Sequence, residues 1–371
     1  MKNHIIIGAG ILGASTAYKL AQEGENVTII DRQEPGQATQ AAAGIICPWI
    51  SQRRNKAWYA LVKAGAAYYP KLIQDLEKEG ESDTGYAQVG ALSLHSDGKK
   101  LDEMVKRAEK RKLDAPEIGE ITRLSALEVQ ELFPPIAEGL EGVHVSGAAR
   151  VDGAALKDAL LRSAKRNGAT IIYGDASIQI DDQGKSSILV DQTRYHADSI
   201  IVTAGAWADT LLAPLNIQFN VKAQKAQIVH LELQDQETSE WPVIMPQGDQ
   251  YLLSFPDGQI VAGATHEDEV GFDERVTASG TLELLSKALT HAPGLSDASV
   301  KTVKVGFRPF TPNFLPVIGR LPGHPEILLA NGLGASGLTM GPYIGSELAK
   351  MALVQDSSID LSLYEISQAI E

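Results

Sequence analysis

The N-terminal sequence reads Ile5-Ile6-Ile7-Gly8-Ala9-Gly10-Ile11-Leu12-Gly13, and a second apolar run, Val27-Thr28-Ile29-Ile30, ends at Asp31. This pattern predicts a strand, a tight turn, a helix and a second strand. Gly8 permits the turn, Gly10 lets a pyrophosphate approach the backbone, and Gly13 lets the helix pack closely on the strand. Free N–H groups at the helix start attract phosphate, and the Asp31 carboxylate suits a ribose hydroxyl. The stretch therefore predicts a dinucleotide site; a glycine-rich turn without a ligand is the alternative.

The composition is that of an ordinary globular protein. The chain has 371 residues, of which 44% are hydrophobic and 22% charged, enough for two domains with buried cores. Its 33 basic and 47 acidic residues give a net charge of −14, which disfavours nucleic acid and anionic membranes as partners. The early apolar run is too short for a signal peptide, and no stretch approaches the roughly 18 apolar residues of a transmembrane segment.

The chain has a single cysteine, Cys47. One cysteine excludes an intrachain disulfide and a cysteine-cluster metal site, so we expect no metal and a cytoplasmic location. For Cys47 itself we favour a small buried side chain over a reactive thiol.

Two kinds of sequence pattern alternate along the chain. Strand–helix patterns at both ends are interrupted after residue 219 by short strands with hairpin signals, such as Asp257-Gly258. We therefore predict an α/β fold of two domains. A discontinuous Rossmann-like domain takes residues 1–85, 147–218 and 302–371, and an interleaved antiparallel-sheet domain for substrate takes residues 86–146 and 219–301.

Local patterns predict individual elements. Helical spacing marks residues 56–79, 99–112, 153–168 and 280–291, and a capping box opens a helix at 125–133. Segments 169–180 and 186–191 alternate like a pair of strands. The small-residue run 41–46 suits a helix start packed against something flat. A last helix is expected at about 342–354, with Pro342 in its first turn.

Five motifs make the sequence resemble the D-amino-acid oxidase-like family of flavoproteins, which includes glycine oxidase, sarcosine oxidase and the D-amino-acid dehydrogenase small subunit. They lie, in family order, at residues 8–31, 203–207, 263–265, 306–309 and 332–340. Together the motifs are specific for the family but not for a substrate. The resemblance makes the Rossmann-like domain an FAD-binding domain. It also implies non-covalent FAD, because no cysteine matches the position of covalent attachment in sarcosine oxidases.

The resemblance places the adenine half of FAD on the N-terminal motif and the isoalloxazine in a second glycine-rich turn. Backbone N–H groups near 337–340, at a helix start, would face flavin N1 and O2 and stabilise negative charge there. A glycine-rich turn with no ligand is the alternative. The residues expected to contact FAD are Gly8, Gly10, Ile11, Leu12, Gly13, Asp31, Arg32, Ala43, Gly44, Ile45, Gly205, Trp207, Gly332, Gly334, Gly337, Leu338 and Thr339.

Arg308 is the main candidate for substrate binding. A guanidinium binds a carboxylate through two parallel hydrogen bonds, and in the family the arginine of this motif holds the amino-acid carboxylate. A structural ion pair is the alternative. Tyr251 is the second candidate, because family oxidases place a tyrosine of this strand over the carboxylate; a tyrosine packing on a sheet is nearly as plausible. For His266 a solvent-facing position is favoured over one in the site.

The implied reaction is oxidation of the Cα–N bond of a small amino acid (a D-amino acid, glycine or an N-methyl or imino acid) by hydride transfer to flavin N5. The resulting imine then hydrolyses. No side-chain base is required if the amine binds unprotonated, and the sequence shows no paired His/Asp constellation. Strand 259–263 lacks the lysine with which sarcosine oxidases activate oxygen, which slightly favours a dehydrogenase that reduces a quinone or carrier over an oxidase.

Two other functions remain open from the sequence. One is an electron-relay subunit of a hetero-oligomeric amine dehydrogenase without its own substrate turnover; the presence of Arg308 argues against it. The other is a plain NAD-dependent dehydrogenase. The identity of the amino acid, the electron acceptor and the oligomeric state are not determined by the sequence, although a homo-oligomer is possible.

Overall fold

The N-terminal motif forms the centre of a six-stranded sheet. In the computed structural model, which describes residues 1–182 and 184–371, β1 (Asn3–Ile7) pairs in parallel with β2 (Asn26–Asp31) and β12 (Ser199–Val202). The strand order is β18-β19-β12-β1-β2-β8, completed by β8 (Thr170–Tyr173), β19 (His324–Asn331) and the antiparallel edge strand β18 (Val317–Leu321). The central strands are buried and apolar, as in parallel sheets covered by helices.

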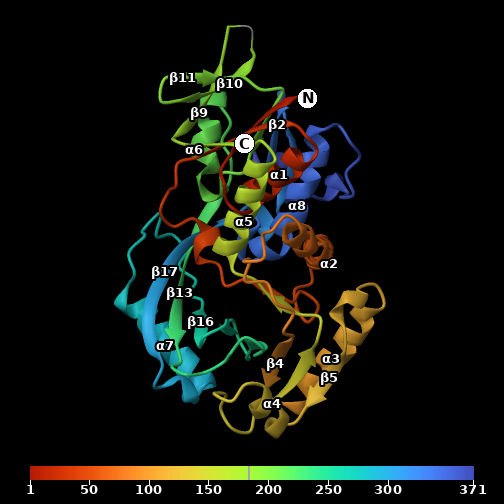
Figure 1. The fold of residues 1–371 in the computed structure, drawn as a ribbon, viewed down its shortest axis with the longest axis vertical. Helices are drawn as coiled ribbons and strands as arrows, with labels where there is room; N and C mark the ends of the chain where they lie inside the picture. The colour runs from red at the N-terminus through yellow and green to blue at the C-terminus, as the bar shows by residue number, and fades with distance from the viewer. Residues whose placement is uncertain (183) are drawn as a thin grey trace.

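Helices pack around α1 (Ile11–Gln22), which follows β1 directly. α1 contacts α5 (Gly153–Arg166) and α8 (Gly337–Ala352) in the upper half of Figure 1, and α8 also contacts α2 (Lys56–Lys78), which lies at about mid-height. Small residues allow these close contacts. A Cβ atom on Gly345 would lie 2.7 Å from Ser15 Cβ, so the α1–α8 contact requires glycine there.

A second, eight-stranded sheet lies below the first in Figure 1. Its order is β17 (Ser299–Phe310), β13 (Lys222–Glu232), β16 (Gln259–Gly263), β15 (Tyr251–Ser254), β14 (Val243–Met245), β4 (Ala91–His95), β6 (Glu141–Val145) and β5 (Ile121–Leu124). The expected antiparallel pairing holds except between β14 and β4, which are parallel. Residue 302 falls inside β17, so the last segment of the predicted FAD-binding domain begins on a strand of this sheet. The division into domains otherwise stays a prediction.

Most predicted helices are confirmed, including α2, α3 (Gly98–Lys112), α5 and α7 (Ala278–His291). α4 (Ala126–Leu132) begins with the predicted capping box at Ser125. α6 (Ala208–Leu212) is a short helix after β12. The Asp257-Gly258 turn joins β15 to β16, and both residues have the positive φ that such hairpin turns need.

The prediction of a helix start at 41–46 was wrong. A 3₁₀ turn at Ala38–Ala41 leads instead into β3 (Ile45–Ile46), which pairs with β7 (Ala149–Arg150). Gly44 explains the difference, because its φ of 87° is incompatible with a helix and its missing Cβ would lie 1.8 Å from the Val151 carbonyl oxygen.

Two further predictions need correction. α8 begins at Gly337, so Pro342 lies inside the helix rather than in its first turn. Proline cannot donate to the carbonyl of Leu338, and the Tyr69 hydroxyl donates to it instead at 2.6 Å. The predicted strand 169–180 is divided at Gly174: β8 joins β2, and only β9 (Ala176–Ile180) pairs with β10 (Ser186–Val190), in a small sheet with β11 (Thr193–Tyr195).

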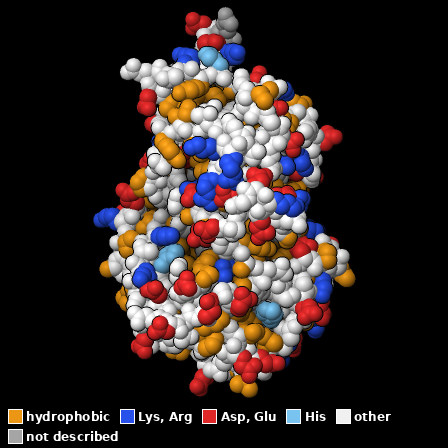
Figure 2. All heavy atoms as spheres, viewed as in Figure 1, with side chains coloured by type: hydrophobic (Ala, Val, Ile, Leu, Met, Phe, Trp, Pro, Cys, Tyr) orange, Lys and Arg blue, Asp and Glu red, His pale blue; other side chains and the backbone are white. Residues whose placement is uncertain are grey.

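Acidic side chains are scattered over the face shown in Figure 2 and are frequent on its lower half, in keeping with the net charge of −14. Within residues 1–182 and 184–371, no helix is both long and apolar enough to cross a membrane. The same residues contain no cluster of His, Cys, Asp and Glu that could hold a metal ion.

Candidate active site

A cavity of about 560 Å³ is lined by both large sheets. Its walls come from the β1–α1 turn, the end of β2, residues 37–45, the turn after β12, β17 and the start of α8. It brings together all the residues predicted to contact FAD or substrate except Gly13 and Gly332.

Gly13 and Gly332 shape the turns without lining the cavity. A Cβ atom on Gly13 would lie 1.9 Å from the Gly8 carbonyl oxygen, as expected for close packing of α1 on β1. Gly332 has a φ of 79°, and its Cβ would lie 1.8 Å from Thr311 Oγ1. The predicted contact of these two glycines with the cofactor stays a prediction.

The β1–α1 turn presents open backbone to the cavity. Gly8 has a φ of 98°, and a Cβ there would lie 2.6 Å from the Thr203 carbonyl oxygen. Gly10 is the N-cap of α1 and supplies no side chain, while the Ile11 N–H donates to Thr39 Oγ1 at 3.0 Å. The other N–H groups of the first turn are a favourable place for a phosphate, because the N-cap glycine has no side chain to bond them.

Asp31 is buried at the end of β2 and faces this turn. Its Oδ2 accepts from the Ala9 N–H at 2.6 Å, and its Oδ1 accepts from the Gln33 N–H at 2.6 Å and from Gln37 Nε2 at 2.9 Å. The carboxylate thus holds the turn as well as lining the cavity. Neighbouring Arg32 is paired with Glu34 at 2.8 Å and with Asp175 at 3.4 Å.

The middle of the cavity lies between the segment before β3 and the start of α8. Thr339 Oγ1 donates to the Ile45 carbonyl oxygen at 2.9 Å and so joins the two. Ser336, the N-cap of α8, makes no capping bond with its side chain. Across the turn after β12, Asn331 Nδ2 donates to the Gly205 carbonyl oxygen at 2.8 Å. This part of the wall is mostly backbone and small side chains, which suits a flat ring system.

At the far end, Arg308 and Tyr251 lie together. Arg308 Nη1 donates to Gln224 Oε1 at 3.2 Å. Burial raises the pKa of Tyr251, and the adjacent Arg308 guanidinium acts in the opposite direction. Among the described residues Arg308 has no carboxylate partner, so the alternative of a structural ion pair finds no support. Gln224 was missed by the sequence analysis because only the β13–β17 pairing sets it opposite Arg308.

The structure also brings together a His/Asp pair that the sequence analysis did not find. His266 Nδ1 lies 3.4 Å from Asp249 Oδ2, and both residues line the cavity. The His266 side chain is 39% exposed, so it is partly open to solvent and also faces the site. The two residues flank the β15–β16 hairpin, and only its closure brings them together. The expectation of no paired constellation was therefore wrong.

Cys47 is buried, and burial raises the pKa of its thiol. A thiol held in its protonated form is a poor nucleophile. The prediction of a small buried side chain is confirmed.

Comparison with known proteins identifies the family. The model of the DAO family, described as FAD dependent oxidoreductase, matches residues 3–351. The chain belongs to this family. It is 59% identical over 371 residues to an uncharacterized oxidoreductase of Bacillus subtilis, with all of both chains covered. It is 27% identical over 369 residues to glycine oxidase of Pseudomonas aeruginosa, with 97% of each covered. The predicted family, α/β fold and FAD dependence are confirmed, and the NAD-dependent alternative is excluded.

Among solved structures, this DAO-family chain is similar to iminodiacetate oxidase from Chelativorans sp. BNC1. The TM-score is 0.95, the identity 46%, and 98% of each chain is covered. Glycine oxidase from Geobacillus kaustophilus shares the fold, with a TM-score of 0.87 at 23% identity and 98% coverage of both chains.

The residues of the cavity fit FAD. The open N-terminus of α1 and the buried Asp31 suit the diphosphate and a ribose hydroxyl. Gly8, Gly10 and Gly44 have no Cβ atom, so FAD could lie close to the backbone at these positions. The start of α8 would carry the positive end of its helix dipole to the ring system.

Proposed function

We propose that this flavoprotein oxidises the Cα–N bond of a small amine that carries a carboxylate, a glycine-like or N-substituted glycine substrate. The observation that carries the proposal is Arg308, which faces the cavity without a carboxylate partner among the described residues. A half-buried guanidinium that lines a cavity and has no carboxylate partner favours a ligand that supplies the negative charge. This also argues against the electron-relay alternative, which needs no carboxylate clamp.

The chain's own residues orient the substrate. Arg308 would hold the substrate carboxylate through two parallel hydrogen bonds, and Gln224 fixes the guanidinium plane from one side. The half-buried Tyr251 lines the same end, next to Arg308. When bound, FAD supplies the two-electron acceptor for the Cα–H bond, and the imine product is hydrolysed by water. Orientation is the protein's main contribution, because near-attack geometry accounts for a large part of such rate enhancements.

The relatives support this substrate class. The similar structure at 46% identity is an iminodiacetate oxidase, and a similar sequence at 27% identity is a glycine oxidase. Glycine and iminodiacetate share an unbranched Cα next to nitrogen and carboxylate. We therefore place unbranched glycine derivatives ahead of D-amino acids with large side chains.

The electron acceptor is the point on which two lines of support differ. β16 has the sequence Gln259-Ile260-Val261-Ala262-Gly263 and no lysine, which slightly favours a dehydrogenase. The relatives named above are oxidases, which favours oxygen. Reoxidation of the reduced protein by air decides between them. Rapid hydrogen peroxide formation at air saturation identifies an oxidase, and slow reoxidation identifies a dehydrogenase.

The proposal is tested by anaerobic reduction of the FAD-loaded protein. Glycine, sarcosine, iminodiacetate, D-alanine and D-proline are each mixed with it, and the loss of flavin absorbance near 450 nm is followed. We expect at least one unbranched glycine derivative to bleach the flavin within seconds. If none of the five reduces the flavin while dithionite does, the substrate class is wrong and the electron-relay alternative is favoured.

A further inference from the structure

Beside Arg308 the cavity holds an imidazole and a carboxylate that the proposed reaction has not yet used. His266 Nδ1 lies 3.4 Å from Asp249 Oδ2. A carboxylate at this distance favours the tautomer that carries its proton on Nδ1. The other ring nitrogen, Nε2, is then an acceptor with a free lone pair.

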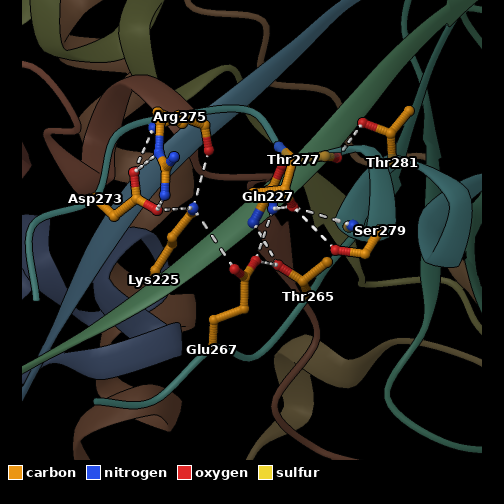
Figure 3. A network of polar contacts seen from close by, with 10 residues as sticks. Lys225, Gln227, Thr265, Glu267, Asp273, Arg275, Thr277, Ser279 and Thr281 are labelled. Carbon is orange, nitrogen blue, oxygen red and sulfur yellow. Dashed lines mark hydrogen bonds and ion pairs between the residues drawn. The ribbon is translucent and has the colours of Figure 1, made fainter. Parts of the chain in front are cut away.

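A polar network fixes the two neighbours of His266 in the chain, Thr265 and Glu267 (Figure 3). Both turn their side chains into the network. Thr265 Oγ1 donates to Glu267 Oε1 at 2.7 Å, and Gln227 Nε2 donates to the same oxygen at 2.7 Å. Successive side chains of an extended segment point to opposite faces. His266 is therefore directed to the other face, where Ala226 also lines the cavity.

The network is anchored at a buried lysine. Lys225 is 0% exposed, and its Nζ lies 3.6 Å from Glu267 Oε2 and 3.5 Å from Asp273 Oδ2. The backbones of Lys225 and Glu267 also exchange two hydrogen bonds, at 3.0 and 2.9 Å. The segment that carries His266 is thus fixed by side chains and backbone together, and the imidazole is held on a rigid support.

The chemistry of the substrate calls for a proton acceptor. The amine of an amino acid is protonated at neutral pH, yet the nitrogen must supply an electron pair to form the imine. We propose that His266, oriented by Asp249, accepts a proton from the substrate ammonium group before the Cα–N bond is oxidised. One ammonium N–H bond breaks, a new N–H bond forms at Nε2, and the freed electron pair becomes the second C=N bond. This inference rests on the proposed function.

The charges around His266 agree with this role. Arg308 on β17, Asp249 before β15, and Lys287 and Glu283 on α7 surround the ring. Burial, followed by the positive charge of Arg308, lowers the pKa of His266, and Asp249 acts to raise it. An imidazole with a pKa below its ordinary value is uncharged at neutral pH and free to accept a proton.

The test is the pH dependence of anaerobic flavin reduction by the best substrate of the panel. In the native protein, we expect the second-order reduction rate to rise with pH through the lowered pKa of His266 and then to level off. In His266→Gln, the rise should continue to the alkaline pKa of the substrate amine. At pH 7 the variant should reduce its flavin about 100-fold more slowly, the lower end of the range for general base catalysis.

Two charge variants give shifts of opposite sign. Asp249→Asn removes the charge that raises the pKa of His266, so the limb of the pH profile should move to lower pH. Lys287→Gln removes a charge that lowers it and also frees Asp249, with which Lys287 pairs at 3.3 Å. In Lys287→Gln the rising limb of the pH profile should therefore move to higher pH. A residue with only a structural role would not produce this pair of shifts.

A second readout does not depend on turnover. 2-Aminoisobutyrate has no Cα–H bond and cannot be oxidised, so its binding can be followed in the FAD-loaded protein at pH 8. In protein with ¹⁵N-labelled histidine, one of the eight histidines should show a shifted acceptor-nitrogen resonance on binding, because that nitrogen accepts a hydrogen bond from the ligand ammonium group. That resonance should be missing from His266→Gln. No such signal at a ligand concentration that saturates the flavin spectral change would overturn the proposal.

Failure of this inference is distinct from failure of the proposed function. If the panel reduces the flavin but the pH limb is unchanged in all three variants, the substrate class stands and the proton acceptor is wrong. If His266→Gln instead weakens only iminodiacetate and leaves the limb in place, His266 binds a second carboxylate, and the proposal is also overturned.

Discussion

The two ends of the cavity are built by different means. At the nucleotide end the wall consists mainly of backbone. Gly8 and Gly10 shape the turn, the N-terminus of α1 faces the cavity, and Asp31 accepts a hydrogen bond from the turn. At the substrate end the wall consists of the side chains of Arg308, Tyr251, His266 and Asp249, which come from separate strands and loops, and Gln224 accepts a hydrogen bond from Arg308. At the first end a Cβ on Gly8 would lie 2.6 Å from a backbone oxygen, whereas the second end depends on the functional groups it carries. Substitutions should therefore separate the two ends by what they disturb.

The largest expected effect is at the substrate end. Arg308→Lys keeps the charge but loses the second parallel hydrogen bond, and an error of about 1 Å in substrate placement costs on the order of 100-fold. We expect kcat/KM to fall by about that factor while FAD content and melting temperature stay unchanged. Arg194→Lys, on β11, is the control and should behave as the native protein. Near-native kinetics of Arg308→Lys would contradict the proposal that Arg308 binds the substrate carboxylate through two parallel hydrogen bonds.

Asp31→Ala should act at the nucleotide end. A hydrogen bond to a charged group contributes about 1.5–3 kcal/mol, so loss of a ribose contact should weaken FAD binding about 10- to 150-fold. Because Asp31 also holds the turn, some stability of the FAD-free protein should be lost too. Asp97→Ala removes the N-cap of α3, where Asp97 accepts from the Lys99 N–H at 2.9 Å, and is the matched control. It should lose stability without losing FAD; equal FAD loss in both variants would contradict the assignment.

A pair of glycines tests whether the nucleotide end is limited by space. Gly24 and Gly8 both have positive φ, but nothing lies within 4 Å of a Cβ on Gly24, whereas one on Gly8 meets a backbone oxygen. Gly24→Ala should cost only the left-handed strain, about 1–2 kcal/mol. Gly8→Ala should cost about 1–3 kcal/mol more in urea unfolding and should lower FAD content. Similar unfolding free energies for the two variants would show that conformation, not space, selects glycine at residue 8.

The smallest expected effect comes from Tyr69, which lies outside both ends of the cavity. Tyr69→Phe keeps the ring, which stacks on Tyr86 at 5.6 Å, but removes the donor to the Leu338 carbonyl that Pro342 leaves free. An unsatisfied buried acceptor costs about 1–2 kcal/mol, so the melting temperature should fall by a few degrees. Flavin content and kcat/KM should stay at the values of the native protein. The exposed Tyr173→Phe should change none of these, and a loss of activity in Tyr69→Phe at unchanged stability would link this contact to the site.

The same contrast explains how much the sequence could predict. The glycines, Asp31 and the apolar runs form one local unit, so their spacing alone predicted β1, α1 and β2. Local rules also predicted α4 from its capping box and the hairpin from Asp257-Gly258. These features depend on backbone conformations that neighbouring residues determine.

What the sequence could not predict depends on contacts between distant segments. Asp249 and His266 meet only because β15 and β16 pair, and Gln224 faces Arg308 only through the β13–β17 register. The end of α8 nearest the cavity was misplaced because Pro342 appeared to mark a helix start, and Tyr69, far away in the chain, compensates for it. Arg308 and Tyr251 were selected through a family resemblance, which carries such long-range information indirectly.

One further consequence follows from Trp207. Its ring lines the cavity and stacks on Phe272 at 5.1 Å with planes 12° apart, while Phe272 itself is 49% exposed at the surface. The indole also lies edge-on to Phe307, with ring centroids 6.2 Å apart, so aromatic contacts connect the interior of the site to the surface. Its fluorescence overlaps flavin absorption, so energy transfer would quench it whenever the cofactor is in place. The fluorescence of Trp207 would therefore report how much of the protein has bound cofactor, without an added label.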